Sequence, residues 1–428
     1  MATRDAYRHG LGKGTILLAS ALFGACGGGH EASDMTAWRA QVDTVGDTVV
    51  VHTLAGSAWG DVELVPEMRI GAVEGADYEI FGQLTGLAVD TAGAIYVYDT
   101  QVPALRKYAA DGSYAGTFGR KGGGPGEYAG SDGGLGGLAV LRDGRVVLRD
   151  PGNGRFTVYA LDGEYLTEVR ARGSYTSVPI VPASDGGFYN PVWERGATSF
   201  LMSIVRYAPD GTPGDTLPAP ERRVEQATVS AATEGASQTW GVPFSPSSQW
   251  TFHPDGYYLS FVTDRYAIDL LRSDQYVLRL SKQAEPVPVS GEERDAQEQR
   301  VTAAMRRLVP SWRWNGPPIP NTKPIVHYLY VGDDGRIWVQ LYQPGERIPD
   351  AELEPGPDGA APLPQFRERA VFDVFDTDGR YLGTVSAPER FRTSPRPVFR
   401  GDYVWATESD TLGVEYVVRY HIARDERR

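Results

Sequence analysis

Short runs of alternating apolar and polar residues, separated by glycine-containing turns, recur over most of the chain. The segment 86–99, GLAVDTAGAIYVYD, places two such runs around Gly93. The segment 104–119, ALRKYAADGSYAGTFG, repeats the arrangement around Gly112. Alternation with a period of two indicates strands, and the glycine between them supplies the positive φ of a hairpin turn. The pattern therefore predicts a unit of four antiparallel strands.

The same unit recurs along the sequence. A second copy spans 137–169, and its turn glycines, Gly144 and Gly163, are 19 residues apart, as are Gly93 and Gly112. Four looser copies with insertions follow. The first turn glycines of the six copies are Gly93, Gly144, Gly186, Gly256, Gly335 and Gly401. Six four-stranded units in tandem predict an all-β, six-bladed β-propeller.

The two ends of the chain complement each other. The sixth unit has only three strand-like runs before Arg428, and an unassigned run, Asp47–Leu54, precedes the first unit. We expect this N-terminal strand to complete the sixth blade, because ring closure leaves no open sheet edge. The prediction is one propeller domain over residues 46–428.

The first two units resemble NHL repeats. The resemblance rests on GLAVDTAGAIYVYDT with LRKYAADGSYAGTFGRKGGGPGEY, and on GGLAVLRDGRVVLRDPGNGRFTVYALDGEYL. Nearly the whole chain after residue 26 also resembles six-bladed propeller lipoproteins of bacterial envelopes, through VVVHTLAGSAWG, DTQVPALRKY, EPVPVSGEER and NTKPIVHYL. This second resemblance implies a fold and an envelope location, and it implies no established activity.

Three insertions interrupt the repeats. Residues 212–249 are rich in Ser, Thr and Pro and predict a loop, and the Pro/Gly-rich residues 343–365 predict a surface loop. Residues 290–310 predict a helix, since Ser290 and Glu293 fit a capping box. Its apolar stripe comprises Val301, Ala304, Met305 and Leu308. We expect this helix to pack on the propeller, and binding of a partner is the alternative role.

The N-terminus predicts export and lipid anchoring. Three basic residues precede the apolar segment Gly14–Ala25, which is too short to span a bilayer as a helix. Cys26 follows two small residues, an arrangement that resembles a bacterial lipobox, although Phe23 replaces the usual leucine. We expect residues 1–25 to be a lipoprotein signal peptide, Cys26 to be the acylated residue and 26–45 to be a flexible tether. A plain secretory peptide is the alternative.

The net charge and the cysteine count exclude some classes of partner and of metal site. The 428 residues carry a net charge of −13, which argues against a nucleic-acid surface as the main partner. Cys26 is the only cysteine, so an intrachain disulfide and a multi-cysteine metal site are excluded. Gly27 after Cys26 favours the outer membrane, facing the periplasm or the surface. We expect a monomer.

Two sets of residues are candidates for a site. Asp90, Asn190 and His253 lie at or near the ends of predicted inner strands or nearby hairpins and are the candidate tunnel-mouth residues. Lactonase-type propellers hold a metal at the tunnel mouth with carboxylates and an Asn, so a divalent metal such as calcium is the alternative at these residues. The histidines are too widely spaced for a zinc site, and no cofactor is predicted. The second set, a candidate aromatic rim for a sugar or peptide, comprises Trp240, Trp250, Trp312 and Trp314.

The glycine-rich segment 119–128, GRKGGGPGEY, predicts a connector between blades, because no helix or Lys-Ser/Thr pair follows it as in phosphate-binding loops. The acidic turns 332–336 and 376–380 predict hairpins, since they lack a calcium-loop ligand series.

The favoured function is a non-enzymatic envelope lipoprotein that binds a protein, peptide or glycan. The alternatives are a metal-dependent hydrolase or lyase at the tunnel mouth and a structural part of a transport or assembly complex.

Overall fold

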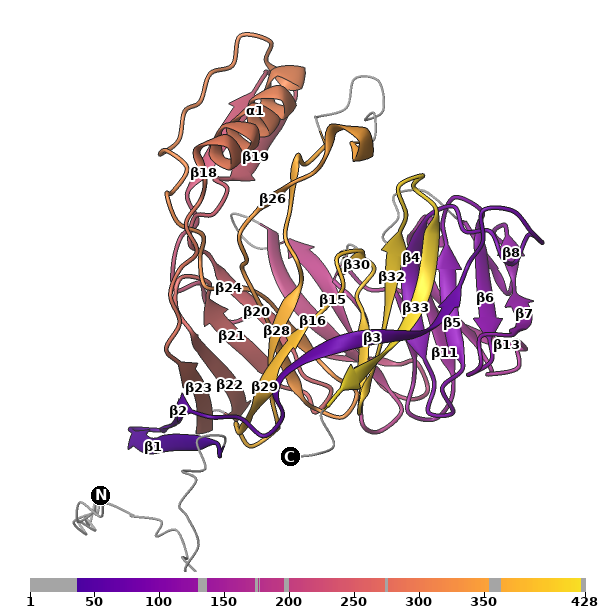
Figure 1. Ribbon diagram of the computed structural model, residues 1–428. Helices are drawn as coiled ribbons and strands as arrows, with labels where there is room; N and C mark the ends of the chain where they lie inside the picture. Colours follow the sequence, from indigo (N-terminus) through magenta and orange to yellow (C-terminus); the bar gives the residue numbers. More distant parts are fainter. Residues whose placement is uncertain are drawn as a thin grey trace, which may run out of the picture. The chain divides into compact units, whose positions relative to one another are not determined.

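The computed structural model is built almost entirely of β-strands (Figure 1). The residues it describes are 37–129, 137–173, 176, 178–195, 200–273, 276–353 and 363–424. The expected signal peptide, Cys26 and the first part of the tether lie outside these residues. No helix among the described residues is both long and apolar enough to cross a membrane.

Six four-stranded units form the blades, and the strands of each blade run in order from the innermost to the outermost. Blade 1 comprises β4 (Leu84–Val89), β5 (Ile95–Asp99), β6 (Ala104–Tyr108) and β7 (Tyr114–Phe118). Blade 2 comprises β10 (Leu138–Val140), β11 (Val146–Asp150), β12 (Arg155–Tyr159) and β13 (Tyr165–Arg170). Blade 3 comprises β14 (Val181–Pro182), β15 (Phe188–Arg195), β16 (Phe200–Tyr207) and β17 (Pro213–Pro218).

The later blades carry the insertions. Blade 4 comprises β20 (Ser248–Phe252), β21 (Tyr258–Val262), β22 (Ala267–Ser273) and β23 (Tyr276–Lys282). Blade 5 comprises β24 (Val326–Val331), β25 (Ile337–Leu341), β28 (Val371–Phe375) and β29 (Tyr381–Ser386). Blade 6 comprises β31 (Val398–Arg400), β32 (Tyr403–Ser409), β33 (Glu415–Ala423) and β3 (Gly60–Ile70).

The innermost strands of all six blades line one central channel of about 110 Å³. Its walls are mainly apolar, with Leu87 from β4, Val140 from β10 and Phe252 from β20 among them. Neighbouring blades are held together by buried apolar side chains, as where the rings of Phe156 and Phe188 meet edge to face at 5.1 Å. The predicted six-bladed, all-β propeller is confirmed.

An N-terminal strand closes the sixth blade, but not the strand that the sequence predicted. β3 is the outermost strand of blade 6 and pairs antiparallel with β33, with Leu64 opposite Ile422 (Figure 1). The predicted closing run lies in β2 (Thr48–Ala55), which instead pairs in parallel with β23 of blade 4. β1 (Arg39–Val45) pairs with β2, so blade 4 has six strands and the expected tether is partly a strand. The closing run was missed because its alternation is interrupted at Val65 and Pro66, next to the point where its pairing with β33 shifts register.

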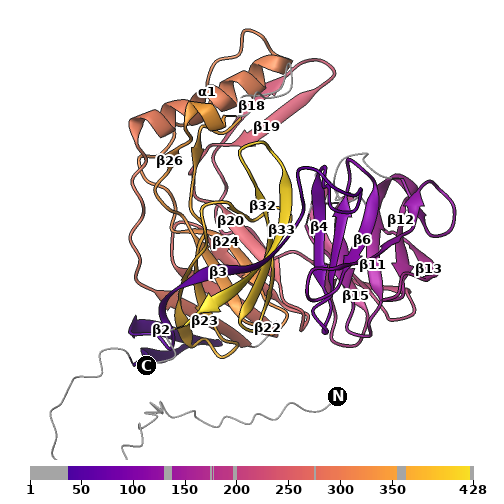
Figure 2. The ribbon, with the colours of Figure 1, turned by 45° about the vertical axis from the view of Figure 1, so that its right-hand side comes forward.

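The two faces of the propeller differ in their connections. Tight hairpin turns join the first strand to the second, and the third to the fourth in blades 1 to 3 and 5, with Gly112 and Gly144 at a φ of +87°. These turns therefore lie together on what we call the turn face. The chain enters every innermost strand from the opposite face, which we call the connection face and which also carries the three insertions (Figure 2).

Two of the insertions fold onto each other. The predicted helix is present as α1 (Gly291–Leu308), and Ser290 Oγ accepts a hydrogen bond from the Glu293 amide at 3.1 Å. The segment predicted as a loop instead contains a hairpin, β18 (Thr228–Ala232) and β19 (Ser237–Gly241). A buried cluster joins hairpin and helix, and its core comprises Val229, Ala231, Val242, Val301, Met305, Trp312 and Ile319. The helix thus packs on the hairpin, and we call the two together the insertion lobe (Figures 1 and 2).

The third insertion is less regular. It contains β26 (Glu346–Arg347), which pairs with β27 (Phe366–Arg367), and residues 354–362 lie outside the described part. The remaining short elements are β8 (Arg120–Lys121), β9 (Glu127–Tyr128), η1 (Pro151–Asn153), η2 (Asp350–Glu352) and β30 (Phe391–Arg392).

Candidate functional site

A cavity of about 1170 Å³ lies on the connection face. Its walls come from the start of β4, from β24 and β25, from the third insertion and from residues 391–396, which lead into blade 6. The side chains that define its chemistry are Tyr328, Tyr330, Gln340, Phe366, Arg392 and Arg396. We call this the connection-face cavity. Aromatic, amide and guanidinium groups on a concave surface are typical of a ligand-binding site.

Two arginines of the cavity wall are neutralised by carboxylates. Arg392 forms an ion pair with Glu415 at 3.2 Å. Arg367 pairs with Glu352 at 2.8 Å and also with Glu389.

Arg396 differs from both of these arginines. No carboxylate among the described residues lies within ion-pair distance of it. Its guanidinium carbon lies 5.5 Å from the centre of the Tyr330 ring, and Nη2 is 3.5 Å from the Val331 carbonyl. The side chain is partly exposed. Arg396 is therefore the cavity arginine whose positive charge is not neutralised by a carboxylate of the described residues, so it can bind an anionic group of a ligand.

A buried tyrosine orients a neighbouring amide. The Tyr330 hydroxyl donates to Gln340 Oε1 at 3.1 Å, and burial raises the pKa of Tyr330 above its usual range. Because Gln340 Oε1 accepts this hydrogen bond, the amide N–H groups of Gln340 are the donors that this wall offers to a ligand.

His327 lies on the cavity wall, stacked obliquely on Tyr342 with ring centres 4.5 Å apart. One side of the His327 ring is exposed to the cavity, and protein atoms pack around the rest of the ring. Desolvation lowers the pKa of His327, and Lys323 acts in the same direction against the opposing Glu368. The ring is thus neutral at pH 7 and offers hydrogen bonding without charge.

The predicted tunnel-mouth residues do not form a site together. None of Asp90, Asn190 and His253 is among the residues that line the channel or the cavity. Asp90 Oδ1 accepts hydrogen bonds from the amides of Ala92 and Ala94, both at 2.9 Å, and so caps the first hairpin.

The other two candidates are also buried. Asn190 lies in the second strand of blade 3, and neither of its buried amide atoms has a hydrogen-bond partner among the described residues. His253 lies in the first turn of blade 4. Its Nδ1 accepts from the Asp255 amide at 3.1 Å, and its Nε2 faces the Gly335 carbonyl at 3.4 Å.

Acidification is expected to destabilise the protein through His253. Burial lowers the pKa of this imidazole, with Arg272 and Arg142 adding to the effect and Asp255 and the Gly335 carbonyl opposing it. The unfolded chain therefore takes up a proton first as the pH falls through about 6.5, so the contribution is complete above that pH and is lost below it.

The measurement is the melting temperature between pH 7.5 and 5.5. His253→Asn keeps an acceptor for the Asp255 amide and is expected to make the decline with pH shallower than in the wild type. Identical slopes for the two proteins would contradict this role of His253.

The described residues contain no group of three or more His, Cys, Asp or Glu side chains placed to hold a metal ion. The acidic turns are used internally instead. Asp376 Oδ1 accepts from the amides of Asp378 and Arg380, and Asp333 pairs with Arg400.

Three of the four candidate rim tryptophans meet in the insertion lobe. Trp312 is buried and donates its indole N–H to the Ser230 carbonyl at 2.8 Å. Trp314 packs against its edge, and Trp240 contacts the same cluster. Trp250 lies in blade 4, where it contacts Tyr258 at 5.2 Å. The four therefore form no continuous rim.

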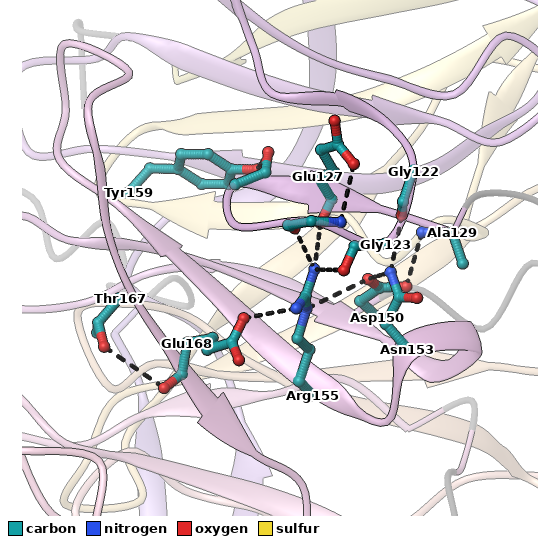
Figure 3. A network of polar contacts seen from close by, with 12 residues as sticks. Gly122, Gly123, Glu127, Ala129, Asp150, Asn153, Arg155, Tyr159, Thr167 and Glu168 are labelled. Carbon is teal, nitrogen blue, oxygen red and sulfur yellow. Dashed lines mark hydrogen bonds and ion pairs between the residues drawn. The ribbon is translucent and has the colours of Figure 1, made fainter.

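The glycine-rich segment is a connector between blades 1 and 2 (Figure 3). Arg155 Nη2 donates to the carbonyls of Gly123, Gly124 and Glu127 at 3.3, 2.6 and 3.1 Å. Asn153 donates to the Gly122 carbonyl at 2.9 Å. Because the loop turns its carbonyl oxygens toward a cation, its geometry is opposite to that of an anion-binding loop.

Sequence reasoning missed the connection-face cavity. Its residues come from blades 1, 2, 5 and 6, from the segment that leads into blade 3 and from an insertion, so no contiguous motif marks it. One signal was present: Arg396 stands between Pro395 and Pro397, and a charged residue between two prolines has a restricted backbone.

Comparisons with known proteins concern the fold. No protein-family model and no curated protein sequence matches the chain. A putative exported protein from Bacteroides fragilis is similar with a TM-score of 0.44 and 11% identity, over 85% of this chain and 99% of its own. A duf4221 family member from Bacteroides vulgatus has a TM-score of 0.44 and 8% identity, over 86% and 100%. Virginiamycin B lyase from Staphylococcus aureus has a TM-score of 0.40 and 10% identity, over 83% and 99%.

Proposed function

We propose that the chain is an exported, lipid-anchored envelope propeller that binds a protein, peptide or glycan in the connection-face cavity. The observation that carries this proposal is the cavity itself, about 1170 Å³ in volume and lined by aromatic and hydrogen-bonding side chains. The resemblance to six-bladed propeller lipoproteins and the lipobox-like residues before Cys26 support the envelope location.

The central channel also supports binding rather than hydrolysis. A tunnel enzyme of the kind considered from the sequence needs several carboxylate, amide or imidazole groups that converge on the axis. The lining of the channel is mainly apolar, and its charged members are Asp333, which is paired with Arg400, and Arg396. The channel therefore presents a mainly apolar surface next to the connection-face cavity, whose lining is polar and aromatic.

Photo-crosslinking in living cells tests the proposal. A benzophenone amino acid placed at Tyr328 or Phe366, on the cavity wall, is expected to yield a crosslinked product of higher mass. The same substitution at Tyr114, which is 40% exposed on the outer strand of blade 1, serves as the control and is expected to yield none. Equal products from both places, or none from the cavity, would contradict binding in the cavity.

A further inference from the structure

The junction between the cavity and the channel contains one charged side chain. Four residues line both spaces, namely Leu87, Leu138, Pro179 and Arg396. We call this junction the throat. Three of its residues are apolar, so the surface next to the partly exposed guanidinium of Arg396 is mainly apolar.

The charge of Arg396 is balanced differently from its neighbours. The cavity arginines Arg367 and Arg392 each have a carboxylate partner, whereas Arg396 has none among the described residues. A cation on an apolar surface attracts an incoming anion more strongly than a cation in bulk water does, because the local dielectric constant is lower. The throat therefore favours an anionic group of the ligand.

The planar geometry of a guanidinium suits a carboxylate, which it binds through two parallel N–H···O bonds. The contact with the Tyr330 ring holds Arg396 over the throat, and Gln340 adds amide donors nearby. A dianionic phosphate suits the site less well, since one unpaired arginine offsets one charge and Glu352 and Glu415 line the same cavity.

We propose that Arg396 anchors an organic carboxylate at the throat, with the apolar or aromatic part of the ligand against Tyr328, Tyr330 and Leu84. This inference rests on the proposed function, because it names the chemistry of the ligand held in the same cavity. The carboxylate has two possible sources, the C-terminus of a peptide or a small organic acid, and the experiment distinguishes them.

The test compares carboxylates with matched amides. The probes are 4-phenylbutanoate against 4-phenylbutanamide, and the peptide acetyl-Ala-Ala-Phe with a free against an amidated C-terminus. Their binding to the full chain carrying Cys26→Ala, which removes the expected lipidation site, is measured by ligand-observed NMR. We expect at least one carboxylate to bind about tenfold more tightly than its amide, as for a charge-assisted hydrogen-bonded pair.

Variants assign the preference to one residue. Arg396→Gln is expected to abolish the preference for the carboxylate while the amide binds as before, and Arg396→Lys to retain part of it. Arg265→Gln removes an equal charge at a 60% exposed side chain in blade 4 and is expected to leave the affinities for the carboxylates and the amides unchanged. Unchanged melting temperatures show that the variants are folded.

Each outcome has one meaning. Preference for the peptide acid identifies a peptide C-terminus, and preference for phenylbutanoate identifies a small acid. Absence of any carboxylate preference, or a preference that survives Arg396→Gln, overturns the anchor role. If crosslinking from Tyr328 persists in that case, the proposed function stands and only the carboxylate inference fails.

Discussion

Replacing Lys323 by methionine is expected to lower the free energy of unfolding by about 3–5 kcal/mol, the usual cost of breaking a buried ion pair from one side. Lys323 Nζ lies 2.7 Å from Glu293 Oε1 and 2.9 Å from Glu368 Oε1. It also donates to the Gln343 carbonyl at 2.9 Å. The side chain of Lys323 is fully buried and that of Glu293 is 3% exposed, so the variant leaves a carboxylate without solvent or counterion. Chemical denaturation measures the change.

A second substitution provides the control. Adding Glu293→Gln to Lys323→Met removes the uncovered charge and is expected to restore a large part of the lost stability. A loss below about 1 kcal/mol for Lys323→Met alone, as for an exposed pair, would contradict the buried network.

This network has a consequence for the site. Glu293 belongs to the first turn of α1, whereas Glu368 directly follows Phe366 and Arg367 on the cavity wall. Lys323 thereby ties the insertion lobe to the third insertion. Loss of the tie is expected to disturb the cavity as well as the stability, because the wall is built from the segment that Lys323 holds.

Two N-terminal truncations are expected to distinguish the roles of β2 and β3 in closing the ring. A chain that begins at Ala72 lacks β3 and should not fold cooperatively. β3 contributes the buried Val62, Leu64 and Ile70, and β33 would be left as an open edge. At about 2–5 kcal/mol for each buried aliphatic side chain that is lost, the total approaches the whole stability of a typical domain.

The matched truncation begins at Ala58 and removes β1 and β2 only. In those strands Val51 is the buried apolar side chain, and the six-stranded blade 4 keeps its own four strands, so the propeller should remain folded. Circular dichroism melting and size-exclusion chromatography compare the two chains. A cooperatively folded Ala72 chain would contradict the closing role of β3, and an unfolded Ala58 chain would show that β2 is also required for the fold.

The parts of the fold that were predicted correctly depend on neighbours in the sequence. Strand alternation around Gly93 or Gly112 and the capping of α1 by Ser290 are local, since each involves residues within one hairpin or one helical turn. The hairpin β18–β19 was missed because its apolar residues are few and its packing partner, α1, is about 60 residues away in the sequence.

The candidate site was harder to predict than the fold. Asp90 and His253 were assigned to the channel because they end innermost strands, but their side chains turn back to cap hairpins on the turn face. The direction of a side chain at a strand end depends on local hydrogen bonds that strand periodicity does not describe.

The sequence by itself determined the repeat unit, its sixfold recurrence and the helix, because each follows from short-range periodicity and turn chemistry. Only the tertiary structure decided that β3 closes blade 6 and that Arg396, Tyr330 and Gln340 meet above the channel. The physical reason is that closure joins segments more than 300 residues apart. Strand pairing and side-chain convergence over that separation depend on the packing of the whole ring.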